Sequence, residues 1–403
     1  MPGTFLFDDR LPSLSPLADL RPAWDIRTGA FTTLERIEAM IGRAVDGLVS
    51  GGDLAALARE RDPRALSPSE APAGLYLNAR CVLPPDRAFS LAMGEALVDE
   101  RGETVAALAD HAAAGRLLAG DPSSLRTIAS PVPMLSRPWH VRMHRDACLL
   151  RDMALLAGRI PFATSLPACI AFGPQRLHVA PSAKVYPGVT FDLEAGPVVI
   201  DERAVIRPGA QLIGPCYVGR DSTVLERATI RPGTAIGPVC KVNGEVGGTI
   251  FQGFSNKAHD GYVGDSYLGE WVNLGAGTTT SNLLNTYGEI IAKASPALGN
   301  ERTGLQYLGS IIGDHVKTAI CTRLMTGTVV HTGAMIATTA AASGCVLPFA
   351  WCTDAGTRSF RLDKFTEIMR TAMGRRKVEP TAAYVARVAE LHRLALETSP
   401  KGA

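Results

Sequence analysis

The sequence predicts two differently built parts: a mixed α/β N-terminal part and a C-terminal part coiled from six-residue repeats. Two observations predict this division. Aliphatic residues recur with a strict period of six across residues 200–242, whereas residues 1–165 combine short apolar runs with helical patterns. The composition agrees, because aromatic residues make up only 6% while glycine (40) and proline (27) are abundant, which suits small repeated turns.

The repeat places an aliphatic residue at every sixth position: Ile200, Ile206, Leu212, Val218, Val224, Ile230, Ile236 and Val242. In the first seven repeats a small residue follows four positions later, as in Ala204 and Ala210. A helical period of 3.6 does not generate this spacing. Three six-residue strands make one triangular turn whose aliphatic residues point inward, and successive turns pair in parallel. We therefore predict a parallel β-helix over residues 166–355.

The period is interrupted near residues 243–262 and 283–308, where we expect the chain to loop out from one edge of the coil. Polar groups gather in and just after the first interruption: His259, Tyr262, Asn273, Asn282 and the run Gly275-Ala276-Gly277. Histidine accepts a proton from an attacking amine or hydroxyl near neutral pH. A backbone N–H beside Gly275 or Gly277 can bind the oxyanion of an acyl-transfer intermediate. The sequence thus points to acyl transfer.

These residues carry a family resemblance. The strings His259-x-x-Tyr262-x-Gly264-Asp265 and Asn273-Leu274-Gly275-Ala276-Gly277-Thr278, followed by Asn282, resemble the acetyltransferase domain of the bifunctional N-acetylglucosamine-1-phosphate uridylyltransferase/glucosamine-1-phosphate acetyltransferase. The resemblance implies a left-handed β-helix in which His259 deprotonates the amine of a hexosamine phosphate.

The same resemblance implies the remaining site residues. Tyr262, Asn273 and Asn282 would bind the sugar phosphate, with Lys241 and Lys257 among the nearest basic residues to its phosphate. The backbone at Ala276 and Gly277 would meet the thioester of acetyl-CoA, the expected co-substrate. Ile320 departs from the family, which places a small polar residue near the donor.

Residues 253–283 and 6–37 also resemble the shortened sugar-nucleotidyltransferase-like proteins of the alternate bacterial type. This resemblance implies a reduced nucleotidyltransferase-like α/β domain over residues 1–165, with a first strand at residues 4–7. The glycine-rich phosphate loop expected after that strand is missing. Helical patterns cover residues 32–48 and 103–118.

A second site is expected in this N-terminal domain. Its candidate residues for a Mg²⁺-bound nucleotide are Arg10, Arg21 and Asp25, together with Asp8, Asp9 and Arg27. Asn78-Ala79-Arg80 stands where the full enzyme has its metal-binding aspartate. Transfer of a nucleotide from UTP or dTTP to a sugar-1-phosphate is therefore the first alternative function, and a non-catalytic sugar-nucleotide-binding scaffold is the second.

The bulk composition limits the partners. With 41 basic and 39 acidic residues there is no large field for nucleic acid or an anionic membrane. We expect a cytoplasmic protein, because no signal peptide or membrane-spanning run is apparent and the eight cysteines show no disulfide-like spacing. Residues 356–403 are predicted to be helical and to cap the coil, and association in threes is expected because β-helices of this type usually form homotrimers.

Overall fold

The computed structural model describes residues 2–398, which divide into two compact units. The first comprises residues 2–26, 31–140 and 381–388, and the second comprises residues 27–30, 141–380 and 389–398. The predicted fold class is confirmed: an α/β domain, a left-handed parallel β-helix and C-terminal helices are all present. Residues 399–403 of the predicted helical segment lie outside the described range. No helix within residues 2–398 is long and apolar enough to cross a membrane.

The first unit is built on a seven-stranded sheet with the order β3-β2-β1-β4-β6-β5-β7. The strands are β1 (Thr4–Phe7), β2 (Gly47–Val49), β3 (Ala65–Leu66), β4 (Gly74–Asn78), β5 (Glu95–Val98), β6 (Thr104–Ala109) and β7 (Arg126–Ala129). Strands β3, β2, β1 and β4 run parallel, and β6 lies antiparallel between β4 and β5. The carboxyl ends of β1 and β4 therefore meet at one edge, where open α/β sheets bind ligands.

Both helical patterns predicted in this unit are only partly correct. Helix α1 (Thr33–Ile41) begins at a capping box and ends at left-handed Gly42, so the rest of the predicted segment turns into β2. The second pattern splits into β6 and helix α3 (His111–Leu118), with Asp110 capping the helix. Residues 104–109 are buried between two neighbouring strands, and such a central strand reads as a continuous apolar run.

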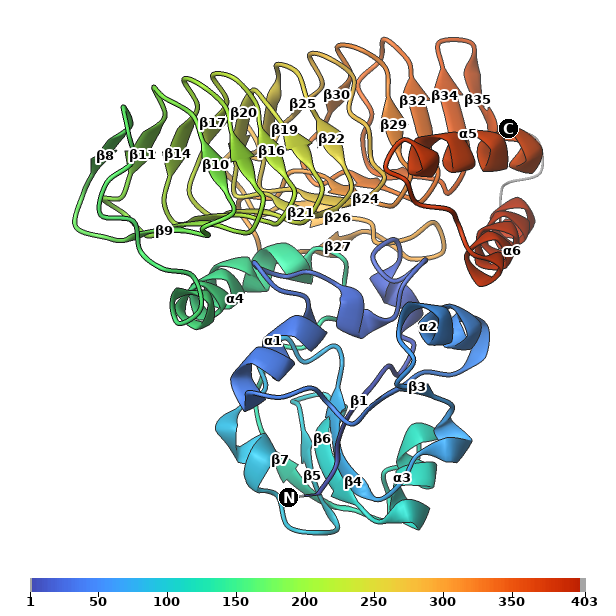
Figure 1. Ribbon diagram of the computed structural model, residues 1–403. Coiled ribbons are helices and arrows are strands. Elements are labelled where there is room, and N and C mark those ends of the chain that lie inside the picture. Colours follow the sequence, from blue (N-terminus) through green and yellow to red (C-terminus); the bar gives the residue numbers. More distant parts are fainter. Residues whose placement is uncertain (1, 399–403) are drawn as a thin grey trace. The chain divides into compact units, whose positions relative to one another are not determined.

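The second unit is a triangular coil whose turns stack from β8 to β35 (Figure 1). Its first side contains β9 (Leu177–Val179), β12 (Val198–Ile200), β15 (Cys216–Val218), β18 (Thr234–Ile236), β21 (Ile250–Gly253), β24 (Tyr267–Glu270), β28 (Ile311–Ile312), β31 (Val329–Val330) and β33 (Cys345–Val346). Its second side contains β8 (Ile170–Phe172), β11 (Thr190–Asp192), β14 (Gln211–Ile213), β17 (Thr229–Ile230), β20 (Glu245–Gly247) and β23 (Tyr262–Gly264), followed by β25 (Thr279–Thr280) and β30 (Arg323–Leu324).

The third side carries the candidate site. It contains β10 (Lys184–Val185), β13 (Val205–Ile206), β16 (Thr223–Val224), β19 (Lys241–Val242) and β22 (Asn256–Lys257), and then β29 (Lys317–Thr318), β32 (Met335–Ala337), β34 (Ala350–Thr353) and β35 (Gly356–Ser359). Asn273 joins the two runs, because it bridges Asn256 on one side and Lys317 on the other. The third side is therefore one continuous ladder along most of the coil.

The predicted inward residues form the core of the coil. Ile206, Val224 and Val242 stack in register on the third side and are fully buried. Burying such a side chain contributes roughly 1.5–3 kcal/mol, and a single turn buries its face only against its neighbours. The stacked turns, whose core is mainly aliphatic but includes Phe191 and Phe251, hold this unit together.

The first predicted interruption does not loop out. Between Val224 and Val242 one turn takes 18 residues, whereas the next turn closes in 15, from Val242 to Lys257. The corners of this turn contain fewer residues, but all three strands are present. The six-residue period is therefore broken, although the parallel pairing of the strands continues. The second interruption does leave the coil, and it contains the antiparallel pair β26 (Ile291–Ala292) and β27 (Glu301–Arg302).

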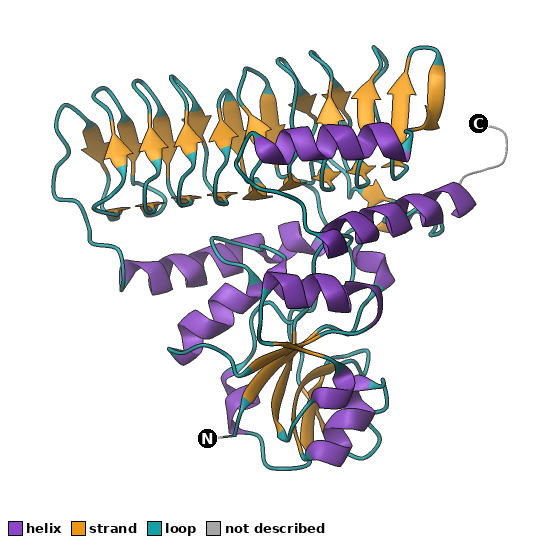
Figure 2. Cartoon of the chain, turned by 45° about the vertical axis from the view of Figure 1, so that its right-hand side comes forward, coloured by secondary structure: helices purple, strands orange, loops and turns teal. Residues whose placement is uncertain are grey.

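Helices accompany the coil. Helix α4 (His140–Ala157) precedes it, α5 (Leu362–Gly374) lies along it, and α6 (Ala382–Thr398) ends the described chain (Figure 2). Phe365 of α5 packs edge-on against Phe349, with ring centroids 4.9 Å apart, at the last turns of the coil. Helix α5 thus covers apolar side chains that the end of the coil would otherwise expose.

Candidate active site

His259 lies on a corner of the coil, between β22 on the third side and β23 on the second. Its side chain is exposed, and no protein group within residues 2–398 hydrogen-bonds its ring. The corner is fixed from inside, because the ammonium of Lys257 bonds the carbonyl oxygens of His259 and Asp260. The imidazole is therefore displayed to solvent on a corner with a fixed backbone.

Lys257 itself is not placed as predicted. It pairs in register with Val242 and so points into the coil, where it is 2% exposed. This position belongs to an aliphatic residue in the preceding turns, from Val185 to Val242, and burial lowers the pKa of Lys257 to about 8. Lys257 does not reach the surface that a sugar phosphate would contact, and we withdraw it as a phosphate ligand.

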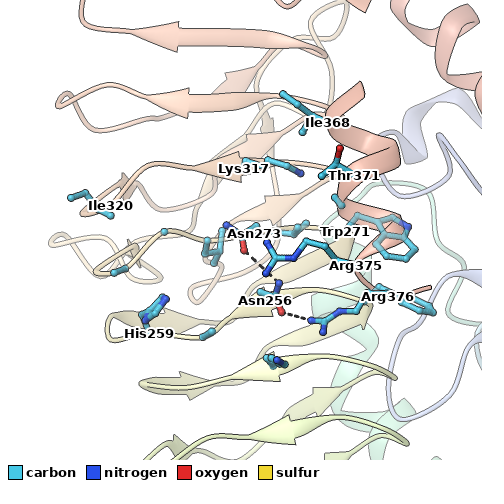
Figure 3. A pocket seen from close by; sticks show the side chains of 18 of the residues that line it. Asn256, His259, Trp271, Asn273, Lys317, Ile320, Ile368, Thr371, Arg375 and Arg376 are labelled. Carbon is cyan, nitrogen blue, oxygen red and sulfur yellow. Dashed lines mark hydrogen bonds between the residues drawn. The ribbon is translucent and has the colours of Figure 1, made fainter. Parts of the chain in front are cut away.

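A pocket of about 680 Å³ opens on the third side of the coil beneath α5 (Figure 3). Four of the predicted residues line it: His259, Asn273, Ala276 and Lys241. Lys241, Asn256, Asn273 and Lys317 occupy successive positions of one outward column, each paired with the next. The pocket therefore combines a free imidazole, amide side chains and ammonium groups within a volume typical of small-molecule sites.

Tyr262 and Asn282 form a separate group around Asp265. The Nδ2 of Asn282 donates to the Tyr262 hydroxyl (3.2 Å) and to Asp265 Oδ2 (2.8 Å). Asp265 Oδ1 accepts from Arg142 Nε (2.7 Å) and Arg145 Nη1 (2.9 Å), both from α4. Both amide hydrogens of Asn282 are thereby used, so only its Oδ1 is left to accept a bond from a ligand. Burial, reinforced by Asp265, raises the pKa of Tyr262.

Of the backbone donors near the pocket, the two expected ones are occupied. The N–H of Gly275 donates to Thr318 Oγ1 (3.0 Å), and that of Gly277 donates to the Asp260 carbonyl (3.1 Å). The N–H of Ala276, which lies between them, has no partner among residues 2–398. Gly277 does not line the pocket, whereas Ala276 does. Of these three consecutive N–H groups, the one at Ala276 is therefore left to bind a ligand.

Three cationic residues of the pocket were missed by the sequence analysis: Lys317, Arg375 and Arg376. Lys317 follows Asn273 in the outward column, and Arg375 and Arg376 come from the end of α5. Arg376 Nη2 donates to Asn256 Oδ1 at 2.7 Å, which ties this end of the helix to the third side (Figure 3). Of these three residues, only Lys317 could have been predicted from the sequence. It directly precedes an inward residue of the resumed six-residue repeat and so occupies an outward position.

Only part of the predicted nucleotide set converges, because Asp8, Asp9 and Arg10 line one pocket of the first unit, whereas Arg21 and Asp25 do not. Arg10 pairs with Asp53 and bonds the Gly51 carbonyl (2.6 Å). Arg21 is fully buried and donates to the Leu17 carbonyl (3.0 Å), and Asp25 faces Arg61 at 3.4 Å.

The other predicted nucleotide residues, Asp8 and Arg27, also have hydrogen-bond partners within the protein. The carboxyl of Asp8 accepts from the backbone N–H groups of Arg10 and Ala23, and burial raises its pKa. Arg27 belongs to the second unit, where its backbone N–H donates to Gln252 (2.9 Å). The predicted set is therefore only partly assembled: Asp8, Asp9 and Arg10 share a pocket that Arg21 and Asp25 do not line.

The carboxylate of Asp9, at the end of β1, shows why a metal does not fit. It accepts bonds from Arg80 Nε (2.7 Å) and Nη2 (2.5 Å), and from Asn78 Nδ2 (2.9 Å). The guanidinium of Arg80, which also contacts Glu103 at 2.9 Å, thus fills the space beside this carboxylate with positive charge. Across residues 2–398 no three histidine, cysteine or acidic side chains cluster to hold a metal ion.

The chain thus joins an α/β domain to a left-handed parallel β-helix that carries a polar pocket, and comparison with known proteins shows what these parts are similar to. Residues 4–160 match the family model described as sugar nucleotidyl transferase. The bifunctional protein GlmU of Methanococcus maripaludis is 34% identical over 152 residues, which are 35% of this chain and 34% of the relative. A bifunctional sugar-1-phosphate nucleotidylyltransferase/acetyltransferase of Sulfurisphaera tokodaii is 34% identical over 143 residues, 33% of each chain. The predicted resemblance to these bifunctional enzymes is confirmed.

The extent of these matches is limited. They span about a third of the length of the curated relatives. Among solved structures, a UDP-N-acetylglucosamine acyltransferase of Francisella novicida covers 58% of this chain and 89% of its own, at 13% identity and a TM-score of 0.22. A likeness at that score supports no inference about activity.

Proposed function

We propose that the β-helix is an acyltransferase that moves an acyl group from acyl-CoA to the amine of a phosphorylated hexosamine. The observation that carries this proposal is the free imidazole of His259 at the mouth of a pocket that also contains Asn273 and the Ala276 N–H. The bifunctional relatives, whose names include acetyltransferase, support the same reaction class and favour acetyl-CoA as donor. A homotrimer and a cytoplasmic location complete the proposal.

The reaction follows from these groups. The amine nitrogen attacks the thioester carbon while the His259 imidazole accepts the proton that the nitrogen loses. The Ala276 N–H stabilises the negative charge that develops on the carbonyl oxygen. The C–S bond then breaks, and the departing thiolate takes up the proton held by His259. The products are an amide and a free thiol.

A free-thiol assay with acetyl-CoA and glucosamine-1-phosphate tests this function. We expect thiol release by the wild-type protein and a loss of at least ~100-fold in His259→Ala, the usual scale for a general base. Asp260→Ala is the matched control, because it changes an exposed side chain on the same corner and should keep activity within a few-fold. Equal losses in both variants would assign the effect to corner geometry, and no release by folded wild-type protein would refute this acceptor.

The family match over residues 4–160 favours a second candidate function in the first unit, namely nucleotide binding. A pocket of about 300 Å³ lies at the ends of β1 and β2, and its lining includes Asp8, Asp9, Arg10, Gly51 and Gly52. Because the guanidinium of Arg80 occupies the Asp9 carboxylate, we propose that this pocket binds a nucleotide but does not catalyse nucleotidyl transfer. UTP should then raise the melting temperature of the protein without release of pyrophosphate in the presence of Mg²⁺ and a sugar-1-phosphate. Pyrophosphate release would establish nucleotidyl transfer instead.

A further inference from the structure

Helix α4 has apolar residues on two faces. One face is buried and includes Leu149. The opposite face is exposed, and its apolar residues recur at intervals of four, three and four positions: Met143, Ala147, Leu150 and Ala154. These intervals place the four side chains in one line along the helix. We call this line the α4 stripe.

Ordinary surface composition explains only half of the stripe. Alanine is frequent in helices because of its high helix propensity, which accounts for Ala147 and Ala154. Met143 and Leu150, by contrast, are 39% and 54% exposed and gain nothing from contact with water. Exposed apolar residues are common when they are scattered singly, whereas four in one line with no charged residue among them are typical of a contact surface.

The helix that carries the stripe is held in place by its other side. Arg142 Nε and Arg145 Nη1 both donate to Asp265 Oδ1, at 2.7 and 2.9 Å, and α4 lies beside the coil (Figure 1). The exposed face is therefore already ordered, and a partner that binds it does not have to fold or fix the helix.

The order of large and small residues in the stripe identifies the partner. A two-fold axis that passes midway between positions 148 and 149 brings a second α4 antiparallel to the first. Met143 then lies opposite the partner's Ala154, and Ala147 lies opposite the partner's Leu150. Each large side chain meets a small one, so the two helices can pack closely. A parallel pair in register would instead oppose large to large and small to small, which leaves gaps.

We propose that two copies of this chain associate through the α4 stripe as an antiparallel helix pair. Helix α4 has 18 residues and is therefore about 27 Å long. One helix pair of this length forms a small interface, with Asp146 and Arg151 beside the apolar line as its polar rim. We therefore expect association that is reversible and depends on protein concentration. The inference is independent of acyl transfer, because no residue of the stripe lines the pocket beneath α5.

Sedimentation equilibrium of the full chain between about 1 μM and about 1 mM tests the proposal. The mass of Leu150→Glu gives the baseline, because this change places a carboxylate in the apolar contact. The wild-type mass should rise to at least twice that baseline, and the dissociation constant of the variant should be at least ~10-fold larger, the scale of losing a central apolar contact. Leu396→Glu is the matched control, since it makes the same change at an exposed leucine of α6 and should associate as wild type.

Mixtures of variants test the two-fold register. Ala147→Lys alone should fail to associate, but it should associate with Leu150→Glu, because the introduced ammonium and carboxylate lie opposite each other across the axis. Added salt should weaken this mixed complex. Ala154→Lys is the control partner for Leu150→Glu, since its ammonium lies about 10 Å away along the helix and should not restore association.

Three results would overturn the proposal. The first is a wild-type mass that stays at the baseline up to about 1 mM. The second is an equal loss of association in Leu150→Glu and Leu396→Glu, with circular dichroism showing that both are folded. The third is restoration by Ala154→Lys as complete as that by Ala147→Lys, which would exclude the antiparallel register.

Discussion

The buried Lys257 gives the sharpest test of how this coil is stabilised. Its pKa of about 8, compared with the ordinary value of 10.5, means that keeping its ammonium charged inside the coil costs about 3 kcal/mol at neutral pH. Methionine has a similar length and needs no hydration, so Lys257→Met removes this cost along with the two bonds to the carbonyls of His259 and Asp260. At a single pH, the change in the free energy of unfolding combines the removed cost of the charge with the loss of the two hydrogen bonds. Only the charge makes this change depend on pH.

The sign of that dependence is fixed. Between pH 8 and 10.5 the unfolded chain holds more protons at Lys257 than the folded chain, so wild-type stability at this site rises with pH. Below pH 8 the cost of the charge is constant. From pH 7 to pH 10 the wild type should therefore gain about 2–3 kcal/mol in the free energy of unfolding relative to Lys257→Met. Lys317 contributes equally to both proteins and cancels.

Urea unfolding followed by circular dichroism at pH 7, 8, 9 and 10 measures the two profiles. The control is Lys184→Met, the same substitution at an exposed, outward position of the third side, whose profile should run parallel to that of the wild type. Parallel profiles for Lys257→Met and the wild type across this range would refute the reasoning. They would mean that Lys257 titrates in the folded protein as it does in water.

Two further outcomes are expected. Gly275→Ala should lower the free energy of unfolding by about 2–3 kcal/mol, because its Cβ would lie 2.5 Å from the carbonyl carbon of Ala319 in the next turn. Gly374→Ala, where a Cβ meets nothing within 4 Å, should be neutral or stabilising, and equal effects in thermal melts would contradict the steric explanation. Asp265→Asn leaves two arginines of α4 without their carboxylate and should cost about 3 kcal/mol, with a fall in acyl transfer as Asn282 loses its anchor. An unchanged melting temperature would show that Asp265 does not hold this network.

The sequence predicts the coil well where its period is strict and poorly where corners shorten. Counting by six from Val242 gives 248, 254 and 260, whereas the inward residues are Val246, Phe251 and Lys257. Because the ladder tolerates turns of 15 residues, the period alone does not reveal that Lys257 points inward. The apolar residues Val246 and Phe251 carried the missing signal, which only a repeat of variable spacing would have detected.

The candidate site divides in the same way. His259, Asn273 and Ala276 lie within one continuous motif, so the sequence brings them together without knowledge of the fold. Arg376 follows a helix about a hundred residues further along the chain, and no periodicity predicts its hydrogen bond to Asn256. In the first unit the charges of Arg10, Arg21 and Asp25 are close in sequence, yet short turns direct each to a different local partner. Where the backbone changes direction every few residues, closeness in sequence therefore does not predict that side chains meet at one site.

The outward column from Lys241 to Lys317 places its side chains at fixed intervals along the coil. These intervals are set by the pairing of neighbouring strands at about 4.8 Å, and they do not depend on the conformations of the side chains. Moving a cationic residue by one turn would therefore shift its charge along the pocket by one fixed increment. Related coils can in this way change the spacing of charges on one side by exchanging single residues, while every inward position and every ladder bond remains the same.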